Sequence, residues 1–571
     1  GTVDKQPRRA QEVKSVSDYF VVAVSLLDIL VSVVQLATGP EQVGVTFDEP
    51  VHLSRSQAWL DDGWYVPQFL IKDGEPDGSM AASPFVYGTS FSAVTHTLNR
   101  VIGIESAGEV SNSEGAWTSR HLVTALLALL GAMAAAIAVL SITGSRMFAL
   151  WTAAALLAIP IWTGMGFFNP KDTPTATGYT LFTTGLVVAL ARQGTTRASV
   201  LRGSAIATLV AVGYFFGAGT RLALWLPLAG TLGAFALLYW ARVRLAEWNP
   251  DYRLLAFIAG GLLAGIAATV LSYPAVFADP VEFLRETVTS SSSFEWTGQT
   301  LTAGRLLSQH PPWWYLPAWT IASIPTLLLG LAILGTAVAF KASLLRSGGD
   351  RVPRSVWRRP ELAISLVLMQ AVGLVLICML ISATMYTGLR QHLYVVPALA
   401  ILAGIGGHWL WIRTGNRLGR SRTWTAVLLC FALALPAIEG GLLFPYNYTY
   451  VSPVAGLGGV NGRWETDFFW ASTREAEERL PDHTVPYCSG QPDDPAALQP
   501  CANFHLPYLT NSPSPELPAS SGKGDTWMLG RMRSNGEMPS GCTDEDNVTR
   551  WLRGERVVMS FVARCRLPGS G

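Results

Sequence analysis

The chain has 571 residues, of which 50% are hydrophobic and only 14% are charged. This composition excludes an ordinary soluble domain, and the long apolar runs that recur along the chain predict a polytopic α-helical membrane protein. The formal net charge of +1, with no block of basic residues, gives no sign of a nucleic-acid partner.

The first apolar segment, at about Tyr19–Leu36, follows the basic residues Arg8, Arg9 and Lys14. The segment is long enough to span a bilayer and lacks a small-residue cleavage site. We therefore predict a retained helix rather than a signal peptide. The basic residues before it place the N-terminus in the cytoplasm by the positive-inside rule.

A polar loop, residues 38–119, follows this helix and contains the stretch Thr46-Phe47-Asp48-Glu49-Pro50-Val51-His52. Two adjacent carboxylates where a membrane helix emerges point either to helix capping or to chemistry. In the capping interpretation, Asp48 caps a helix that carries Pro50 in its first turn. The pattern of apolar and polar residues that follows predicts a short amphipathic helix at about Val51–Leu60, lying on the membrane surface.

Ten further apolar segments predict membrane-spanning helices and bring the expected number to eleven. They lie at about His121–Ile142, Met147–Phe168, Thr175–Ala191, Ser204–Gly219, Leu222–Trp240, Leu254–Val276, Tyr315–Phe340, Leu362–Tyr386, Leu393–Ile412 and Thr423–Leu443. The loops expected in the cytoplasm are rich in arginine, and an odd number of spans puts the C-terminus on the outer face. We predict a transmembrane domain over residues 1–443 and an extracytoplasmic domain over residues 444–571.

The polar tail has the pattern of a small α/β domain, with a short helix at about Thr473–Leu480 and short strands after it. The strands are expected at about Thr484–Tyr487, Asn503–Leu506, Thr526–Leu529 and Val557–Val562. The tail also holds four of the six cysteines, Cys488, Cys501, Cys542 and Cys565. Four cysteines in a small polar domain favour two disulfides and an oxidising compartment. A zinc site is the alternative, although no CxxC spacing is present.

Several cations fall on the face that this topology makes extracytoplasmic, against the usual bias. They are Arg120 and His121 at the start of the second span, Lys171 (followed by the carboxylate of Asp172) between the third and fourth, Arg221 between the fifth and sixth, and Arg390 and His392 before the tenth. Such cations need anionic partners. Either they form internal ion pairs or interface anchors, or they bind an anionic ligand such as a phosphate at headgroup level.

The chain contains no GxGxxG, Walker, HExxH or GxSxG motif in a credible context. Their absence argues against nucleotide-driven transport and against the hydrolase classes that these motifs mark.

The long first outer loop that opens on Phe47-Asp48-Glu49, with His52 nearby, resembles the GT-C superfamily of integral membrane glycosyltransferases. It is most similar to the protein O-mannosyltransferase and aminoarabinose transferase (ArnT-like) branch, although mannosyltransferases lack the inserted Pro50. Ser119–Leu126 resembles the arginine-bearing start of the family's second helix. Four further stretches resemble a bacterial subgroup of such transferases: Asn169–Asp172, Thr220-Arg221, Gly388–His392 and Gly462–Asp467.

The resemblance implies a polyprenyl-phosphate sugar donor, a hydroxyl-bearing acceptor (a glycan, lipid or protein) and inversion at the anomeric carbon, in a bacterial plasma membrane. It makes Asp48 the base, with Glu49 beside it in the catalytic pair. Arg120, Lys171, Arg221, Arg390 and His392 would bind the donor phosphate, and His52, Asp172, Trp464, Glu465 and Asp467 would support the acceptor. No cofactor is required, although Asp48, Glu49 and Asp172 could hold a divalent cation (Mg²⁺, Mn²⁺ or Ca²⁺), as in some relatives.

Two other functions remain open at this point. A transporter or flippase of an anionic lipid or solute would also need cations, but transporters usually show charges or broken helices at mid-span and repeated halves. Here the charges cluster at one face, no repeat is visible and the first loop is far longer than a transporter needs. A non-catalytic assembly protein that kept the fold is the third hypothesis.

Overall fold

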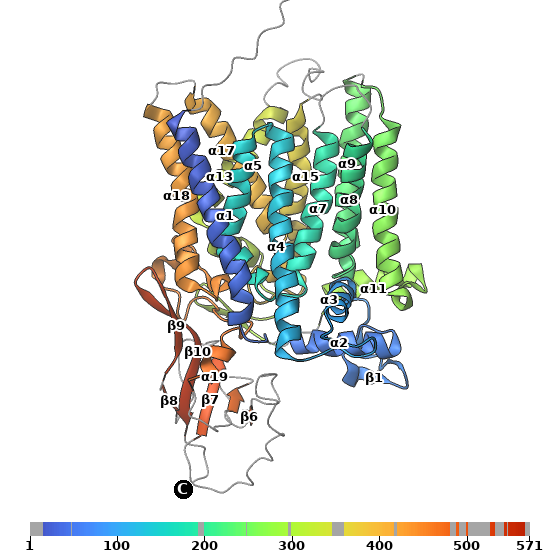
Figure 1. The fold of residues 1–571 in the computed structure, drawn as a ribbon, viewed down its shortest axis with the longest axis vertical. Helices are drawn as coiled ribbons and strands as arrows, with labels where there is room; N and C mark the ends of the chain where they lie inside the picture. Colours follow the sequence, from blue (N-terminus) through green and yellow to red (C-terminus); the bar gives the residue numbers. More distant parts are fainter. Residues whose placement is uncertain are drawn as a thin grey trace, which may run out of the picture.

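A computed structural model describes most of the chain. It covers residues 15–46, 48–191, 199–246, 248–294, 298–344, 359–415, 420–479, 487–489, 498–500, 526–531, 542–544 and 546–565. Long helices run side by side, and a small sheet lies at one end of them (Figure 1). The predicted fold class, a helical polytopic membrane protein with a small C-terminal domain that contains strands, is confirmed.

The helices of the bundle are α1 Val16–Gln42, α4 Glu114–Thr143, α5 Arg146–Ala158, α6 Pro160–Gly166, α7 Asp172–Leu190, α8 Val200–Gly217, α9 Trp225–Leu245, α10 Tyr252–Ser272, α12 Tyr315–Ser323, α13 Thr326–Leu344, α15 Ile364–Leu368, α16 Leu374–Leu380, α17 Val395–Gly415 and α18 Arg420–Leu443. The described chain holds eight helical segments long and apolar enough to cross a membrane, or up to ten if each of two bent pairs is one span. The bent pairs are α5 with α6, at 70°, and α12 with α13, at 117°.

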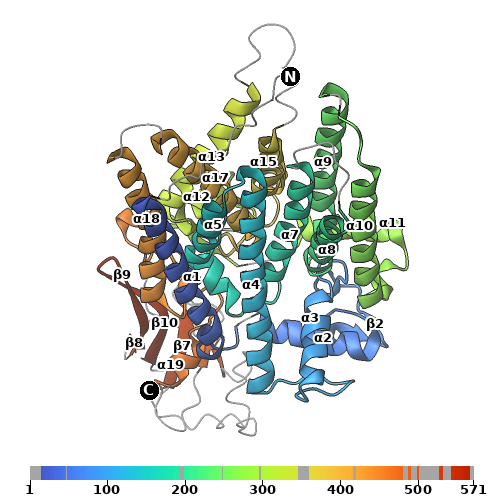
Figure 2. The same ribbon diagram turned by 45° about the horizontal axis from the view of Figure 1, so that its top comes forward.

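The expected span at Thr175–Ala191 is α7, which is helical but is not among these candidates. Its threonines make it less apolar than its neighbours. It tolerates them because it lies between α4, α8 and α9 with nearly every side chain buried (Figure 2). Thr177 and Thr184 donate their hydroxyls to the carbonyls of Leu127 and Ala134 on α4. Polar residues inside a bundle commonly bond neighbouring helices in this way. Because α7 is too polar to count as a span by composition, the expected number of eleven spans exceeds the eight to ten that composition supports.

The first polar loop forms a layer at one end of the bundle, the end that also carries the C-terminal sheet (Figure 1). Its elements are α2 Glu49–Asp62, β1 Ile71–Lys72, β2 Glu75–Pro76 and α3 Ser90–Val101. Between α10 and α12, the helix α11 Pro280–Ser292 and the hairpin of β3 Thr300–Thr302 and β4 Arg305–Leu307 continue the chain. The loop and the tail therefore share one face, as the predicted topology requires.

The amphipathic helix expected at Val51–Leu60 is α2, but its buried face is polar. Glu49, His52, Arg55 and Ser56 are buried, whereas Trp59 is only half-buried. The expectation assumed that the apolar side chains would be the ones in contact with a neighbouring phase. Instead, α2 turns its charged side toward the end of the bundle, and this orientation builds the site described below.

The C-terminal domain contains a six-stranded sheet in the order β6-β5-β7-β10-β8, with β9 also paired to β10. Its elements are α19 Thr473–Glu477, β5 Tyr487–Ser489, β6 Leu498–Pro500, β7 Thr526–Arg531, β8 Cys542–Asp544, β9 Val548–Leu552 and β10 Glu555–Cys565. The helix and the two later predicted strands are present, and β5 begins at the end of the first one; Asn503–Leu506 lies outside the described residues.

No disulfide is found among the side chains that the structure places, and Cys378 and Cys430 are free thiols. The predicted disulfide cysteines Cys488, Cys501, Cys542 and Cys565 lie outside those described side chains.

Candidate active site

The inward face of α2 carries three functional side chains at helical spacing, Asp48, His52 and Arg55. Residues separated by four and then three positions lie on one side of a helix. Asp48 occupies the N-cap position, yet its side chain makes no capping hydrogen bond, and Pro50 sits in the first turn where a missing N–H costs nothing. The carboxylate is therefore directed away from the helix end and is available to other partners.

Those partners are two cations from distant parts of the chain. The Nζ atom of Lys171 lies 2.7 Å from Oδ2 of Asp48, and Nη1 of Arg390 lies 2.6 Å from the same oxygen. The Asp48 side chain keeps 19% of its surface exposed, while both cations are nearly buried. No described residue donates a hydrogen bond to the second carboxylate oxygen, Oδ1, so this oxygen can receive a proton or a hydroxyl group.

Lys171 is positioned by the turn that precedes α7. The side-chain oxygen of Asn169 accepts hydrogen bonds from the backbone N–H groups of Lys171 at 3.1 Å and Asp172 at 2.7 Å. The Asn169 amide in turn donates to Asp172 at 3.0 Å. This asparagine turn closes the Asn-Pro-Lys-Asp stretch on itself, and the lysine side chain is left to reach the site.

Arg390 lies in a short 3-10 turn before α17 that is fixed from outside. The backbone N–H of Gly388 donates to the Tyr315 hydroxyl at 3.0 Å, and that of Thr387 donates to Thr300 at 3.0 Å. Gly388 has a φ of 74°, which favours glycine. The Arg390 guanidinium then lies between the rings of Tyr386 and Phe469, 4.8 and 4.9 Å from their centroids.

Arg221 forms an ion pair with Asp172 beside these residues. Its guanidinium, that of Arg55 and the Lys171 ammonium lie 5.6, 5.2 and 5.5 Å from the centroid of the Tyr87 ring. Two carboxylates, Asp48 and Asp172, thus form ion pairs with three cations, Lys171, Arg390 and Arg221, while Arg55 adds a fourth positive charge. In direct ion pairs, the described site has more positive charge than negative charge.

This imbalance shifts the titration of the site. Burial would raise the pKa of Asp48, but Lys171 and Arg390 outweigh it and hold the pKa well below its usual range. Burial and the charge of Lys171 lower the pKa of His52 well below its usual value, and burial lowers the pKa of His392 to about 4. Asp48 is therefore ionised at neutral pH, and both histidines are neutral.

Glu49 has partners other than those of Asp48. Its Oε2 accepts the backbone N–H of Thr46 at 2.7 Å and the Thr46 hydroxyl at 2.9 Å, while Oε1 lies 2.7 Å from Nε2 of His121. The other ring nitrogen of His121 lies 3.0 Å from the Pro40 carbonyl oxygen. Glu49 therefore ties the start of α2 to α1 and α4 and shares none of the ion-pair partners of Asp48.

Glu49→Ala is expected to lower the stability of the protein. Removing one partner of a buried ion pair typically costs about 3–5 kcal/mol, because His121 and Thr46 would keep buried polar groups without partners. Thermal unfolding of the purified protein in detergent measures the effect, with the exposed Glu75→Gln as the matched control. An unchanged unfolding midpoint together with lost activity would instead make Glu49 a chemical participant.

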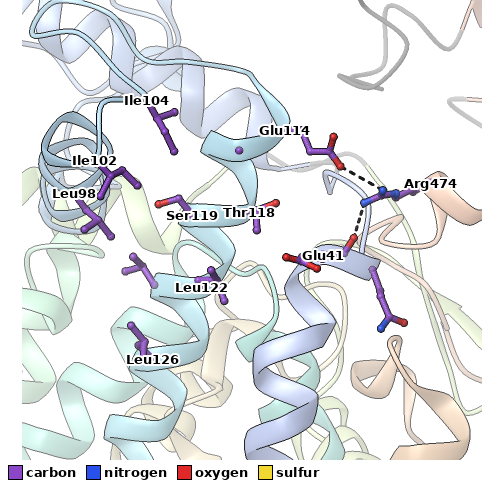
Figure 3. A pocket seen from close by; sticks show the side chains of 13 residues that line it. Glu41, Leu98, Ile102, Ile104, Glu114, Thr118, Ser119, Leu122, Leu126 and Arg474 are labelled. Atoms are coloured by element: carbon purple, nitrogen blue, oxygen red, sulfur yellow. Dashed lines mark hydrogen bonds and ion pairs between the residues drawn. The ribbon is translucent and has the colours of Figure 1, made fainter.

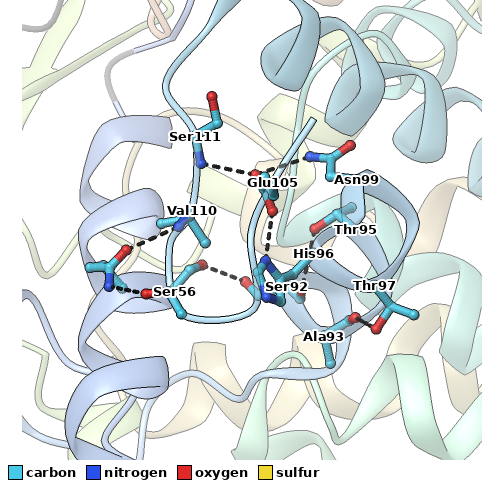
Figure 4. A network of polar contacts seen from close by, with 12 residues as sticks. Ser56, Ser92, Ala93, Thr95, His96, Thr97, Asn99, Glu105, Val110 and Ser111 are labelled. Atoms are coloured by element: carbon cyan, nitrogen blue, oxygen red, sulfur yellow. Dashed lines mark hydrogen bonds and ion pairs between the residues drawn. The ribbon is translucent and has the colours of Figure 1, made fainter. Parts of the chain in front are cut away.

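Arg120 belongs to a second network around Glu105 rather than to the Asp48 cluster. The Glu105 carboxylate accepts from Arg120. It also accepts from the Asn99 amide at 3.1 Å and from the Ser111 backbone at 3.1 Å, and it lies 2.6 Å from Nδ1 of His96 (Figure 4). This network fastens α3 and the following loop to α4. Arg120 nevertheless shares a narrow cavity with His52 and Glu49, so it stays adjacent to the site.

The three predicted support residues in the tail have structural partners. Asp467 accepts from the Tyr448 hydroxyl, from the Ala471 N–H at 2.9 Å and from Ser472. The Trp464 indole donates to the Ala455 carbonyl at 3.2 Å and packs edge-to-face on Trp319. Glu465 is buried, and its backbone N–H donates to the Leu301 carbonyl at 3.0 Å. These residues hold the segment that places Phe469 on Arg390.

The carboxylates proposed for a divalent cation do not form a ligand set. Asp48 faces Lys171 and Arg390, Asp172 faces Arg221 and Asn169, and Glu49 faces His121. Across the described part of the chain, no three His, Cys, Asp or Glu side chains gather as metal ligands would.

A groove of about 870 Å³ lies near the same end of the bundle, between α1, α3 and α4 (Figure 3). Its walls are mainly apolar, with Leu98, Ile102, Leu122 and Leu126 among them. Arg474 marks its polar edge, 3.4 Å from a carboxylate oxygen of Glu114. The groove is separate from the cations around Asp48, and nothing in the structure shows what covers it.

Two residues of the cluster were not predicted from the sequence. Arg55 could have been found, because its spacing from Asp48 and His52 puts all three on one helical face once α2 is recognised. Tyr87 could not, because it lies in a loop and its position depends on contacts with Arg221, far along the chain.

Neither the family models nor the curated protein sequences include a match to this chain. Among solved structures, it is similar to ArnT from Cupriavidus metallidurans bound to undecaprenyl phosphate, with 14% identity over 96% of this chain and 98% of that one and a TM-score of 0.46. The apo form of that protein gives 17% identity, coverages of 84% and 83%, and 0.46. The Archaeoglobus fulgidus oligosaccharyltransferase in its apo form gives 11% identity over 81% of this chain and 59% of that one, with a TM-score of 0.48. At such scores these similarities carry no argument about substrates or residue roles, which depend on the geometry of this chain.

Proposed function

We propose that the protein is an inverting GT-C type glycosyltransferase that moves a sugar from a polyprenyl-phosphate donor to an acceptor hydroxyl, at the membrane face that carries α2 and the C-terminal sheet. The observation that supports this proposal most strongly is the position of Asp48. The Asp48 carboxylate, one oxygen of which receives no hydrogen bond from a described residue, lies among buried cations. Asp48 is the N-cap residue of α2, which lies at one end of the helix bundle (Figure 1). This is where a lipid phosphate would lie while its chain remained in the bilayer.

In the proposed reaction, the Asp48 carboxylate and the cations around it have separate roles. The acceptor oxygen attacks the anomeric carbon and forms the new glycosidic bond while the bond from that carbon to the phosphate oxygen breaks. Asp48 takes the proton of the attacking hydroxyl. The leaving polyprenyl phosphate keeps the bonding electron pair and gains a negative charge. Lys171, Arg221 and Arg390 stabilise this charge, and excess positive charge favours the product phosphate over the less charged donor.

The proposal is tested by reconstituting the full chain in lipid vesicles with a panel of polyprenyl-phosphate sugars and candidate hydroxyl acceptors. Release of polyprenyl phosphate, together with appearance of the sugar on an acceptor, is the expected result. Movement of the intact donor across the bilayer without cleavage would instead favour the transporter function. Binding of the donor with neither outcome would favour the non-catalytic assembly role.

The pH dependence of kcat/KM follows from the shifted titration. Since the pKa of Asp48 is held below its usual value of about 3.9, the base stays ionised as pH falls through the neutral and mildly acidic range. The neutral histidines also do not change charge there. We expect kcat/KM, measured at low donor concentration, to show no acid limb between about pH 5 and 7. An acid limb in that window that disappears in His52→Gln would assign the proton transfer to His52.

A further inference from the structure

Tyr87 is held against Arg221 by the backbone. The two residues form an antiparallel bridge, and the N–H of Gly88 donates to the Thr220 carbonyl at 2.9 Å. Gly88 allows this approach, because a Cβ atom there would lie 2.3 Å from the carbonyl oxygen of Gly219. The ring of Tyr87 is therefore fixed in place rather than swinging freely in a loop.

Cations surround this ring from different directions. Arg55 comes from α2, Lys171 from the start of α7 and Arg221 from the segment before α9, all within 5.6 Å of the centroid. The neutral ring of His52 packs edge-on at 5.0 Å. The attraction of a cation for the face of a ring is weak compared with the repulsion of like charges held this close.

Arg55 is the least compensated of these cations. It is buried, its Nη1 donates to the Tyr65 carbonyl at 3.1 Å, and its Nε is buried without a hydrogen-bond partner. No described carboxylate forms an ion pair with it. The Nε atoms of Arg221 and Arg390 are also buried without partners. A buried guanidinium with unused donors is costly unless an anion satisfies it.

The Tyr87 hydroxyl is a second unused group. No described residue hydrogen-bonds it, although the side chain is buried. Burial raises the pKa of this phenol, but Lys171 and Arg221 outweigh burial and lower it. A more acidic phenol is a stronger donor to an anion.

We propose that Arg55 and Tyr87 are binding residues for a phosphate group, adding a guanidinium and a phenol hydroxyl to the cations Lys171, Arg221 and Arg390. The inference deepens the proposed function, since the phosphate would be that of the lipid donor. Arg55 binds phosphate oxygens through its free donors, and the Tyr87 hydroxyl donates to one of them. Both lie within reach of Lys171 and Arg221, because Arg55 and these two cations share the Tyr87 ring.

Binding of polyprenyl monophosphate and of inorganic phosphate to the full chain in nanodiscs tests this inference. A hydrogen bond to a charged group contributes about 1.5–3 kcal/mol, so Tyr87→Phe, which keeps the ring, is expected to raise the Kd for polyprenyl monophosphate roughly 10- to 100-fold. Arg55→Gln is expected to weaken binding at least as much, and Arg55→Lys less. Tyr179→Phe is the matched control, because the hydroxyl of that buried tyrosine bonds Thr231 within the bundle. Thermal unfolding confirms that each variant is folded.

The outcomes separate this inference from the function it depends on. Wild-type binding of polyprenyl monophosphate that Tyr87→Phe and Arg55→Gln leave unchanged would overturn the inference and leave the proposed function intact. Binding of inorganic phosphate alone, lost in both variants, would uphold the phosphate site but contradict a lipid-phosphate donor. Weakened lipid binding in both variants, with the control unchanged, supports the inference.

Discussion

Asp48→Asn is expected to slow sugar transfer by about 10²- to 10⁴-fold, while the protein keeps, or even increases, its affinity for polyprenyl phosphate. Asparagine has nearly the same shape but cannot take the proton of the acceptor, and loss of a general base typically has an effect of this size. The opposite effect on binding follows from the ion pairs. Asp48 occupies Lys171 and Arg390 at 2.7 and 2.6 Å, so removing its charge leaves both cations free for the phosphate.

Single-turnover transfer and equilibrium binding of polyprenyl monophosphate, measured on the same preparation, give the two readouts. Asp62→Asn, at the exposed end of α2, is the matched control and should match wild type in both. Weakened lipid binding in Asp48→Asn would show that the carboxylate organises the cations rather than competing for them. An unaltered transfer rate would remove Asp48 from the chemistry.

Loss of Arg390 is expected to have the second largest effect. Removing one preorganised donor to a developing negative charge typically costs about 2.7–4 kcal/mol, or a 10²- to 10³-fold loss of rate. Arg390→Gln should therefore lower kcat/KM by about that factor and also weaken phosphate binding. Arg390→Lys should recover only part of the loss, because lysine keeps the charge but lacks the planar fork that lies between Tyr386 and Phe469.

Arg413→Gln offers a matched control for Arg390. Arg413 lies in the last turn of α17, the helix that follows Arg390, and its guanidinium lies over Trp409. It should leave transfer and binding unchanged. Equal losses in the two variants would point to a general effect on α17 rather than to a role of Arg390 in the site.

Hydropathy and periodicity predicted the helices well, because a membrane helix is defined by local composition. They counted α7 as a span on the same basis as its neighbours, but its threonines are tolerated only through contacts that sequence does not display. The pairing of cations was less predictable. Asp48 meets Lys171 and Arg390, which are 123 and 342 positions away. Arg120 instead faces Glu105, only 15 positions earlier, and no feature of the sequence marks Glu105 as its partner.

The sequence also could not predict that two adjacent carboxylates would have different interaction partners. Asp48 and Glu49 are neighbours with the same chemistry, yet one lies at the N-cap of α2 and faces cations from other segments, while the other folds back to Thr46 and His121. The direction of a side chain at a helix start depends on the angle at which the chain enters, and distant packing sets that angle. By contrast, the position of Arg55 could be predicted from the sequence, since helical spacing alone puts it on the same face of α2 as Asp48.

The contact between the Phe469 ring and Arg390 limits where related chains could recombine without damage to the site. A side chain that follows the last membrane helix by many residues forms part of the wall of the site, so the region after residue 443 is not a freely exchangeable module. Recombination between relatives at that boundary would separate the arginine from its aromatic neighbour. Exchange beyond α19 would leave the pair together, and we expect natural and engineered chimaeras to tolerate crossovers there far better.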